Sequence, residues 1–331
     1  MHLAGLSHSE GGIPGGTDLF RKGRDAQLRE SIAYLKGGFV PLSECKLAIY
    51  DLGIVYGAAV TDFLRTFHLQ PYRMEDHVQR FYRSCNYAHL RPPVSMEESM
   101  DISRRLIAQN SKDSLDKELG VVYYLTAGEN AVYAGSAGIS DQLVPSYIQH
   151  TFPLPFRLWR NAFIDGIHCV TPAVRHWPPQ CVSSKIKHRN RLHMWIGDHE
   201  ARLADPTAVA LYLDVSGNIT ETGGSNFVIY RGGKVYSPKR SNILWGISLT
   251  VLTEILAEIG VPFIEEDLQT YDVINATEAW LPTTPYCLGP VVKINGAPIG
   301  EGKPGPVWRR IISRWSEIVK KDIYAEMSEA R

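Results

Sequence analysis

The chain has 331 residues, 44% of them hydrophobic and 10% aromatic, and its 35 Lys and Arg residues balance its 35 Asp and Glu residues. The length suits one large or two ordinary domains, and the balanced charge predicts neither a nucleic-acid nor a membrane partner. The five cysteines are scattered without a Cys-x-x-Cys pair, which argues against a disulfide framework or metal site. Because no apolar run approaches the ~18 residues of a membrane helix, we expect a cytoplasmic protein.

The chain begins with a Gly-rich and then charged stretch, residues 1–30, which we predict to be a loosely held arm. From residue 31 onward, short apolar stretches separated by Gly turns predict strands. Residues 74–90 predict a helix instead, because their apolar side chains recur at helical spacing. These side chains are Val78, Phe81, Cys85 and Ala88.

Two further strands set the expected domain boundary. Residues 119–128 and 145–155 read as strands, and the second ends in a Pro-rich stretch. We therefore expect the chain to change domain at this point. The expected parts are the arm (1–30), a small domain (31–152), a linker (153–160) and a C-terminal domain (161–331).

The second half of the chain is predicted to consist mainly of β-hairpins. Turn residues interrupt apolar stretches at 216–218, 232–233 and 295–296, the last being an Asn-Gly pair. A helix is predicted between the turns at 232–233 and 295–296, with Ser248 as its N-cap and Gly260 at its C-terminal end. Another amphipathic helix is expected to end the chain. Hairpins with outer helices indicate an α+β fold whose second half is barrel-like.

Three features of the second half suggest chemistry. Lys185 and Lys187 would share a face in an extended segment, although a basic run of this kind is usually solvated surface. Glu221 follows a predicted strand, and the helix beginning near Ser248 offers free backbone N–H groups to an anion. Taken alone, each has an ordinary structural explanation. Together, a lysine, a carboxylate and a phosphate cradle are the parts needed to hold pyridoxal phosphate.

Seven motifs extend this pattern from about Tyr34 to Trp315: "YDLGIVYGAAVTDFLRT", "HVQRFYRSC", "KHRNRL", "TETGGSNF", "ILWGIS", "TTPYCLGPV" and "GKPGPVWRRI". Their order resembles that of the class IV aminotransferases, a pyridoxal-phosphate family that includes branched-chain and D-amino acid aminotransferases and aminodeoxychorismate lyase. The resemblance implies the two-domain fold type IV, with a smaller N-terminal α/β sandwich-like domain and a larger C-terminal pseudo-barrel domain. It also implies a homodimer.

The resemblance assigns a role to each matching residue. Lys187 would be the Schiff-base lysine rather than Lys185, because Asn190 follows Lys187 at the family's spacing. Glu221 would pair with the ring nitrogen of the cofactor, and Arg80 would bind its phosphate. The other implied cofactor-binding residues are Asn226, Leu244, Gly246, Ile247, Ser248 and Thr284, and the implied substrate residues are Tyr124, Pro285 and Tyr286.

Substrate choice is where the sequence departs from the family. Residues 122–138 lack the Arg-x-His pair of the D-amino acid enzymes, and Pro285 lacks the backbone N–H that branched-chain enzymes direct at the substrate carboxylate. We therefore predict amino transfer between an amino acid or amine and a 2-oxo acid, with low activity toward D-alanine and the branched-chain amino acids. A lyase is an alternative because "KHRNRL" resembles its motif, although Asp62 replaces the lyase's catalytic threonine. A third alternative is a non-catalytic binding protein of the same fold.

Other residues would then have to complete the substrate site. The cations near predicted cofactor residues in the sequence are Arg65, Arg175 and Arg191. A pocket for a bulkier amino acid or a primary amine would be lined by Tyr123, Tyr124 and Tyr133, although ordinary strand packing explains these tyrosines equally well.

Overall fold

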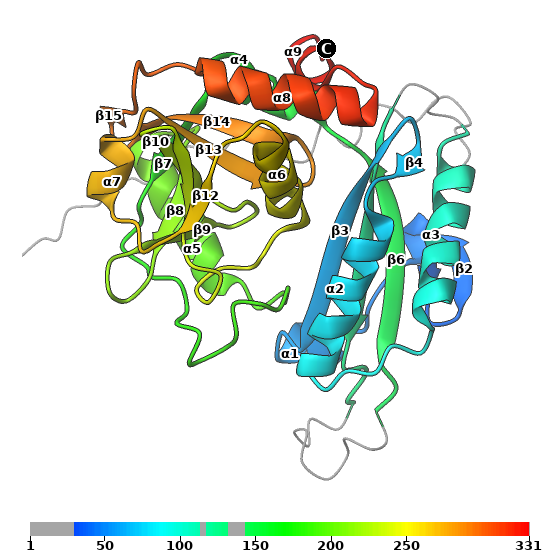
Figure 1. Ribbon diagram of the computed structural model, residues 1–331. Helices are drawn as coiled ribbons and strands as arrows, with labels where there is room; N and C mark the ends of the chain where they lie inside the picture. Colours follow the sequence, from blue (N-terminus) through cyan, green and yellow to red (C-terminus); the bar gives the residue numbers. More distant parts are fainter. Residues whose placement is uncertain (1–29, 113–116, 132–142, 331) are drawn as a thin grey trace, which may run out of the picture. The chain divides into compact units, whose positions relative to one another are not determined.

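The computed structural model describes residues 30–112, 117–131 and 143–330 of the chain. The predicted arm lies outside the described residues except for its last residue. From Ser31 onward, the described residues belong to one compact unit, and they form two β-sheets (Figure 1). The chain leaves the first sheet after β6 and enters the second at β7, which is the region where the sequence predicts a domain boundary.

The first sheet is antiparallel, with the strand order β2-β1-β6-β5-β3-β4. Its strands are β1 (Ile32–Leu35), β2 (Gly38–Pro41), β3 (Ala59–Phe67), β4 (Gln70–Pro71), β5 (Leu119–Thr126) and β6 (Ser146–Pro153). Helices α2 (Met74–Tyr87) and α3 (Met96–Asn110) pack on it through a core that includes Leu64, Phe81 and Leu106 (Figure 1). The predicted helix over 74–90 and the two predicted strands are confirmed.

Short elements complete this half and lead to the next. The 3₁₀ helix η1 (Leu42–Glu44) and helix α1 (Leu52–Val55) lie between β2 and β3. Helix α4 (Phe156–Ile164) begins soon after β6 ends at Pro153. The predicted linker over 153–160 is therefore helical in its second part.

The second sheet is mixed and has the order β12-β11-β10-β13-β14-β7-β8-β9, with β15 paired to β14. Its strands are β7 (Ile167–Val170), β8 (Val209–Leu213), β9 (Ile219–Thr222), β10 (Val228–Arg231), β11 (Lys234–Ser237), β12 (Phe263–Glu265), β13 (Glu278–Thr283), β14 (Cys287–Ile294) and β15 (Ala297–Pro298). The predicted hairpins are confirmed. Asn295 and Gly296 both have positive φ, of 48° and 86°, as a type I′ turn requires.

Helices pack against this sheet and correct two predictions. They are α5 (Leu192–Ala204), α6 (Ile247–Glu258), α7 (Thr270–Ile274), α8 (Pro306–Val319) and α9 (Ile323–Ser328). Ser248 is not the N-cap of α6, because the helix begins at Ile247 and Gly246 takes the cap position. The helix predicted to end the chain is followed by α9, which Asp322 caps by accepting a hydrogen bond from the Ala325 N–H.

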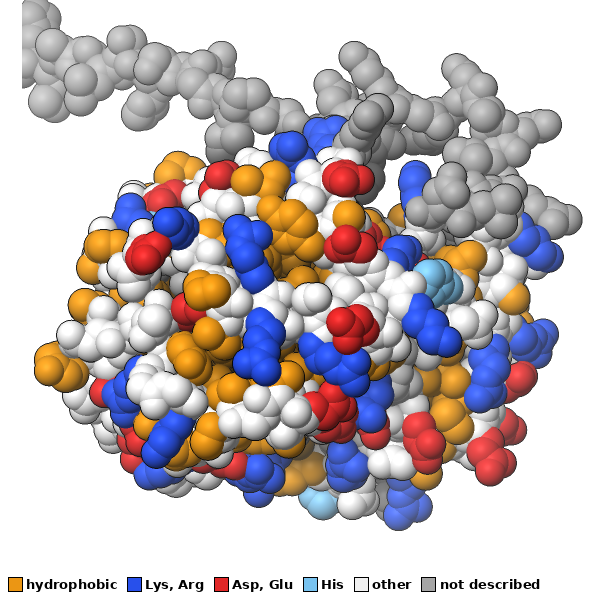
Figure 2. Space-filling model, turned by 45° about the horizontal axis from the view of Figure 1, so that its top comes forward, with side chains coloured by type: hydrophobic (Ala, Val, Ile, Leu, Met, Phe, Trp, Pro, Cys, Tyr) orange, Lys and Arg blue, Asp and Glu red, His pale blue; other side chains and the backbone are white. Residues whose placement is uncertain are grey.

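Charged side chains of both signs are interspersed with hydrophobic ones on the face shown in Figure 2. This mixture agrees with the balanced composition of the chain. No helix in the described part of the chain has the length and hydrophobicity needed to cross a bilayer. Within the same residues, no group of His, Cys, Asp and Glu side chains is arranged to hold a metal ion.

Candidate active site

One pocket gathers residues from α2, the β7–α5 loop, β9, the start of α6 and the β13–β14 loop. All nine residues that the sequence assigns to the cofactor line it: Arg80, Lys187, Glu221, Asn226, Leu244, Gly246, Ile247, Ser248 and Thr284. The sequence separates Arg80 from Thr284 by most of the chain, so the fold brings them together. The three predicted substrate residues are not among the residues that line this pocket.

The segment carrying Lys187 is an irregular loop held by two elements of the first sheet's half. The backbone N–H of Lys187 donates to Ser84 Oγ of α2 over 3.2 Å. Its carbonyl accepts from the Thr61 N–H at 2.8 Å, and the Arg189 N–H donates to the Ala59 carbonyl at 3.0 Å, both on β3. These contacts fix Lys187 in the pocket, whereas Lys185 is exposed outside it.

The surroundings of Lys187 disfavour its charged form. Burial, together with the neighbouring cations Arg191 and Arg80, lowers the pKa of its ammonium group to about 7. The carboxylates of Asp62 and Glu221 act in the opposite direction but do not offset this effect. An amine with this pKa is largely neutral slightly above pH 7 and can accept a proton.

Glu221 and Asn226 fix the turn that precedes α6. The backbone N–H of Leu244 donates to Glu221 Oε1 at 3.1 Å, and Asn226 Nδ2 donates to the Leu244 carbonyl at 2.7 Å. Asn226 Oδ1 accepts from the Gly246 N–H at 3.1 Å. His176 Nε2 lies 3.6 Å from Glu221 Oε1. Glu221 is 8% exposed, so its carboxylate is held in a fixed position at the pocket wall.

The N-terminus of α6 presents uncapped backbone N–H groups at one end of the pocket. No side chain caps this helix, and first-turn N–H groups such as those of Ile247 and Ser248 have no acceptor within a helix. The helix dipole adds partial positive charge at the same place. Gly246 is required there because a Cβ would lie 2.3 Å from Asn226 Oδ1.

Arg80 faces the pocket but already has a buried carboxylate partner. Its Nε and Nη2 donate to Asp62 Oδ2 and Oδ1 at 2.8 and 2.9 Å, and its Nη1 donates to the Trp245 carbonyl at 3.4 Å. His77 Nδ1 lies 2.7 Å from Asp62 Oδ1. Burial alone would raise the pKa of Asp62, but Arg80 and His77 hold it well below its usual range. The guanidinium retains N–H groups for a phosphate.

The pocket is also lined by a stack of aromatic rings, which the sequence analysis did not predict. The Trp177 ring stacks with the rings of His193 and His188, whose centroids are 4.6 and 5.8 Å away. Burial lowers the pKa of both histidines to about 4, so both are neutral at pH 7. Among the described residues, Ser184 Oγ, His188 Nδ1 and both His193 nitrogens are buried without a hydrogen-bond partner. Such groups fit a pocket for a polar ligand.

The tyrosines expected near the substrate have other surroundings. Tyr123 is fully buried, with its hydroxyl 2.8 Å from Ser103 Oγ, so its predicted place in a substrate pocket is wrong. The Tyr286 ring packs against Trp159, with centroids 5.4 Å apart. Tyr124 is half-buried beneath the Arg189 guanidinium. Tyr133 lies outside the described residues.

Comparisons with known proteins identify the family and the fold. The family described as amino-transferase class IV matches residues 59–294. D-alanine aminotransferase of Staphylococcus aureus (strain MSSA476) is 27% identical over 281 residues, which cover 84% of this chain and 94% of the relative. The branched-chain aminotransferase of Escherichia coli superposes with a TM-score of 0.79 at 23% identity, covering 88% of this chain and 95% of that one.

A second solved structure has a similar fold. The branched-chain aminotransferase of Thermobaculum terrenum, solved in its PLP form, has a TM-score of 0.77 at 18% identity and covers 91% of this chain and 97% of its own. At these identities the structural matches concern the fold. The described chain has the fold type IV architecture of these enzymes.

Proposed function

The chain belongs to the class IV aminotransferases, and we propose that the pocket around Lys187 binds pyridoxal phosphate and moves an amino group between an amino donor and a 2-oxo acid. The observation that carries this proposal is the convergence of three groups on one pocket. They are a half-buried lysine whose pKa is lowered to about 7, a fixed carboxylate and an uncapped helix N-terminus.

The residues present fit pyridoxal phosphate at each of its polar ends. The backbone N–H groups of Ile247 and Ser248, with the hydroxyl of Thr284 and the guanidinium of Arg80, suit its phosphate. The Glu221 carboxylate suits the ring nitrogen. The Lys187 amine suits the aldehyde, and its low pKa favours the nucleophilic form.

Each residue then has a defined task. The bound cofactor supplies a ring that withdraws electrons from the carbon of the donor that carries the amino group. Lys187 Nζ would accept the proton from that carbon and deliver it to C4′ of the cofactor. Glu221 keeps a proton on the ring nitrogen, so the ring stays electron-poor. Leu244 would pack against the ring face, and Asn226 holds the Leu244–Gly246 turn in place.

We also propose that the enzyme is a cytoplasmic homodimer. The five unpaired cysteines support the compartment, and one exposed apolar surface supports the dimer. Ile54 and Tyr56, at α1, are 51% and 59% exposed, and Leu192 and Trp195, at the start of α5, are 67% and 71% exposed. The two segments lie close together, because a Cβ on Gly57 would be 3.3 Å from the Asn190 side chain. Large exposed apolar side chains in one area are typical of an interface.

A half-reaction screen tests the proposed activity. Purified protein would be mixed with single amino acids and amines, and conversion of the bound aldehyde cofactor to its amine form would be followed by absorbance, with Lys187→Ala as the inactive control. We expect at least one bulkier amino acid or primary amine to react faster than leucine and D-alanine. If no donor converts the cofactor, the proposed function is wrong.

The same screen tests the role of Pro285. Because proline has no backbone N–H, the Pro285→Ala variant restores a donor that could meet a substrate carboxylate. We expect this variant to gain activity toward leucine relative to amines. Leucine or D-alanine as the best donor of the unmodified enzyme, by a wide margin, would show that Pro285 does not restrict amino acid substrates.

A further inference from the structure

A buried arginine outside the pocket contacts the β13–β14 loop, which forms part of the pocket wall. Arg65 lies on β3 and is 1% exposed, and it is not among the residues lining the pocket. It therefore does not meet a substrate carboxylate there, one of the possibilities that the sequence left open. Its Nη1 instead donates to the Pro285 carbonyl at 3.0 Å, and its Nε donates to the Thr66 carbonyl at 3.0 Å.

The loop that Arg65 contacts is short and conformationally strained. Thr283 pairs with Cys287 across β13 and β14, which leaves Thr284, Pro285 and Tyr286 as a three-residue hairpin connection. Cys287 has a φ of +65°, a left-handed conformation that side chains other than glycine rarely adopt. Such a conformation persists only when its surroundings stabilise it. Arg65 is one such contact, because its Nη1 lies 4.0 Å from Cys287 Sγ.

Arg65 is in turn fixed by the last helix of the chain. Its Nη2 lies 2.9 Å from Glu326 Oε2 of α9, and both side chains are nearly inaccessible to solvent. The guanidinium also stacks on the Phe67 ring, 3.8 Å from the ring centroid. A buried cation needs this kind of complete pairing, so the position of Arg65 depends on Glu326.

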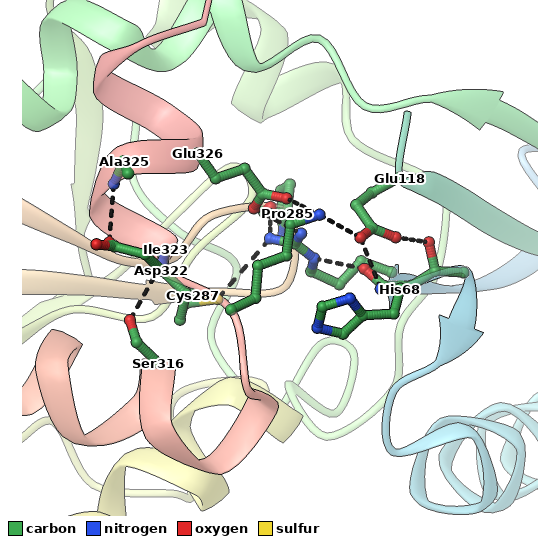
Figure 3. A network of polar contacts seen from close by, with 12 residues as sticks. His68, Glu118, Pro285, Cys287, Ser316, Asp322, Ile323, Ala325 and Glu326 are labelled. Carbon is green, nitrogen blue, oxygen red and sulfur yellow. Dashed lines mark hydrogen bonds and ion pairs between the residues drawn. The ribbon is translucent and has the colours of Figure 1, made fainter. Parts of the chain in front are cut away.

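Glu326 is itself part of a larger network (Figure 3). Lys321 Nζ lies 2.9 Å from Glu326 Oε1 and 2.5 Å from Glu118 Oε1. Glu118 also accepts hydrogen bonds from Thr66 Oγ1 and the His68 N–H at 2.6 and 2.7 Å. The contacts drawn in Figure 3 thus connect the end of the chain with β3 and with the Pro285 loop.

We propose that Arg65 is a positioning residue that holds the Thr284–Tyr286 loop at the pocket wall, and that Glu326 of α9 keeps Arg65 in place. The C-terminal residues 321–326 therefore set the geometry of a site that they do not touch. The proposal rests on the proposed function in one respect: Thr284 lines the pocket assigned to the cofactor. Loss of Arg65 or Glu326 should loosen the loop and weaken binding more than it slows turnover.

Two conservative variants and one control test this directly. Glu326→Gln keeps the shape of the side chain but removes its charge, and Arg65→Lys keeps the charge but removes the planar fork. Arg65→Met is the stronger change and carries a greater risk of misfolding. Arg314→Gln is the control, because it removes an exposed ion pair with Glu258 between α8 and α6, away from the pocket.

Hydrogen–deuterium exchange over residues 284–288 measures the loop without requiring activity. We expect exchange about tenfold faster in Glu326→Gln and Arg65→Lys than in the unmodified protein or Arg314→Gln. We also expect the KM for the amino donor and the Kd for pyridoxal phosphate to rise about three- to tenfold, with kcat changing less. Arg65→Lys should bind better than Arg65→Met.

The contrary result is equally clear. If folded Glu326→Gln and Arg65→Lys keep the loop exchange, KM and Kd of the unmodified protein and only unfold at a lower temperature, Arg65 is a structural residue and the proposal is wrong. Failure of the proposed function would look different. The unmodified protein would then convert no donor, while the exchange measurement would still decide whether Arg65 holds the loop.

Discussion

Lys187 shows how the surroundings of one side chain determine its chemistry. An ordinary lysine has a pKa of about 10.4, whereas burial beside Arg191 and Arg80 lowers the pKa of Lys187 to about 7. The neutral amine is the nucleophile, and its fraction grows as the pH rises through that pKa. The rate at which pyridoxal phosphate binds the apoprotein should therefore rise between about pH 6 and 8 and then level off.

The Arg191→Gln variant tests the cause of this shift. Removing a neighbouring positive charge makes protonation of Lys187 easier, so its pKa should rise and the whole rate profile should move to higher pH. Stopped-flow absorbance of cofactor binding across the pH range measures both proteins. A rate that keeps rising to about pH 10 in the unmodified protein would mean that Lys187 behaves as an ordinary lysine.

Arg80 is predicted to serve the phosphate and the fold at the same time. Arg80→Ala removes a charge-assisted hydrogen bond of roughly 1.5–3 kcal/mol, which corresponds to roughly 10- to 100-fold weaker binding of pyridoxal phosphate. It also leaves Asp62 buried without its main partner, so the melting temperature should fall. Absorbance titration and thermal unfolding measure the two effects.

Asp62→Asn separates the two roles of Arg80. This variant breaks the same ion pair but leaves the guanidinium free for the phosphate. It should lose stability while keeping more cofactor affinity than Arg80→Ala. Unchanged cofactor affinity in Arg80→Ala would show that Arg80 does not bind the phosphate.

At the scale of residues, those that a motif fixes by spacing lie in one pocket, whereas contacts that depend on packing were not predicted. Asn190 distinguished Lys187 from Lys185, and the structure places only Lys187 in the pocket. The stack of Trp177 with His188 and His193 could not be predicted, because it depends on how an irregular loop folds back on α5. The Arg80–Asp62 pair left one signal: a carboxylate within the largely buried strand β3.

At the scale of elements, cofactor affinity should depend more on the backbone at the start of α6 than on the side chains there. Gly246→Ala places a Cβ against Asn226 Oδ1 and should displace the turn that presents the first N–H groups of α6. Ser248→Ala removes one hydroxyl, worth roughly 0.5–1.5 kcal/mol. We therefore expect pyridoxal phosphate to bind more weakly to Gly246→Ala than to Ser248→Ala, as measured by absorbance titration.

Ser95→Ala is the matched control for this comparison. Ser95 caps α3 through a capping box with Glu98, and its loss should cost about 1 kcal/mol of stability without affecting the cofactor. Equal affinity in Gly246→Ala and the unmodified protein would contradict the assignment of the α6 N-terminus to the phosphate.

Local signals explain which elements were predictable. Hairpins at Gly232-Gly233 and Asn295-Gly296 were predicted because these residues adopt the positive φ that their turns need. The cap of α6 was not predicted, because Gly246 is positioned by a residue far away in the sequence: its N–H donates a hydrogen bond to Asn226 Oδ1. Helix α9 was missed because it is short, although Asp322 is an N-cap signal directly before it.

At the scale of the whole molecule, the exposed apolar surface of α1 and α5 predicts self-association. Trp195→Glu places a charge where Trp195 is 71% exposed, so it should weaken a dimer without disturbing the fold. Sedimentation velocity should show a dimer for the unmodified protein and a shift toward monomer for this variant. Leu158→Glu, on α4, is an equally exposed control. A stable, active monomer of the unmodified protein would contradict this surface assignment.

The central claim is that Lys187 holds the cofactor, and reductive labelling tests it most directly. Borohydride reduces the C=N bond between a lysine and pyridoxal phosphate to a stable C–N single bond. Peptide mapping then identifies the modified residue. We predict the label on Lys187 in the purified protein, its persistence in Lys185→Ala and its loss in Lys187→Ala. A label on Lys185, or no labelled lysine at all, would contradict the assignment of the pocket.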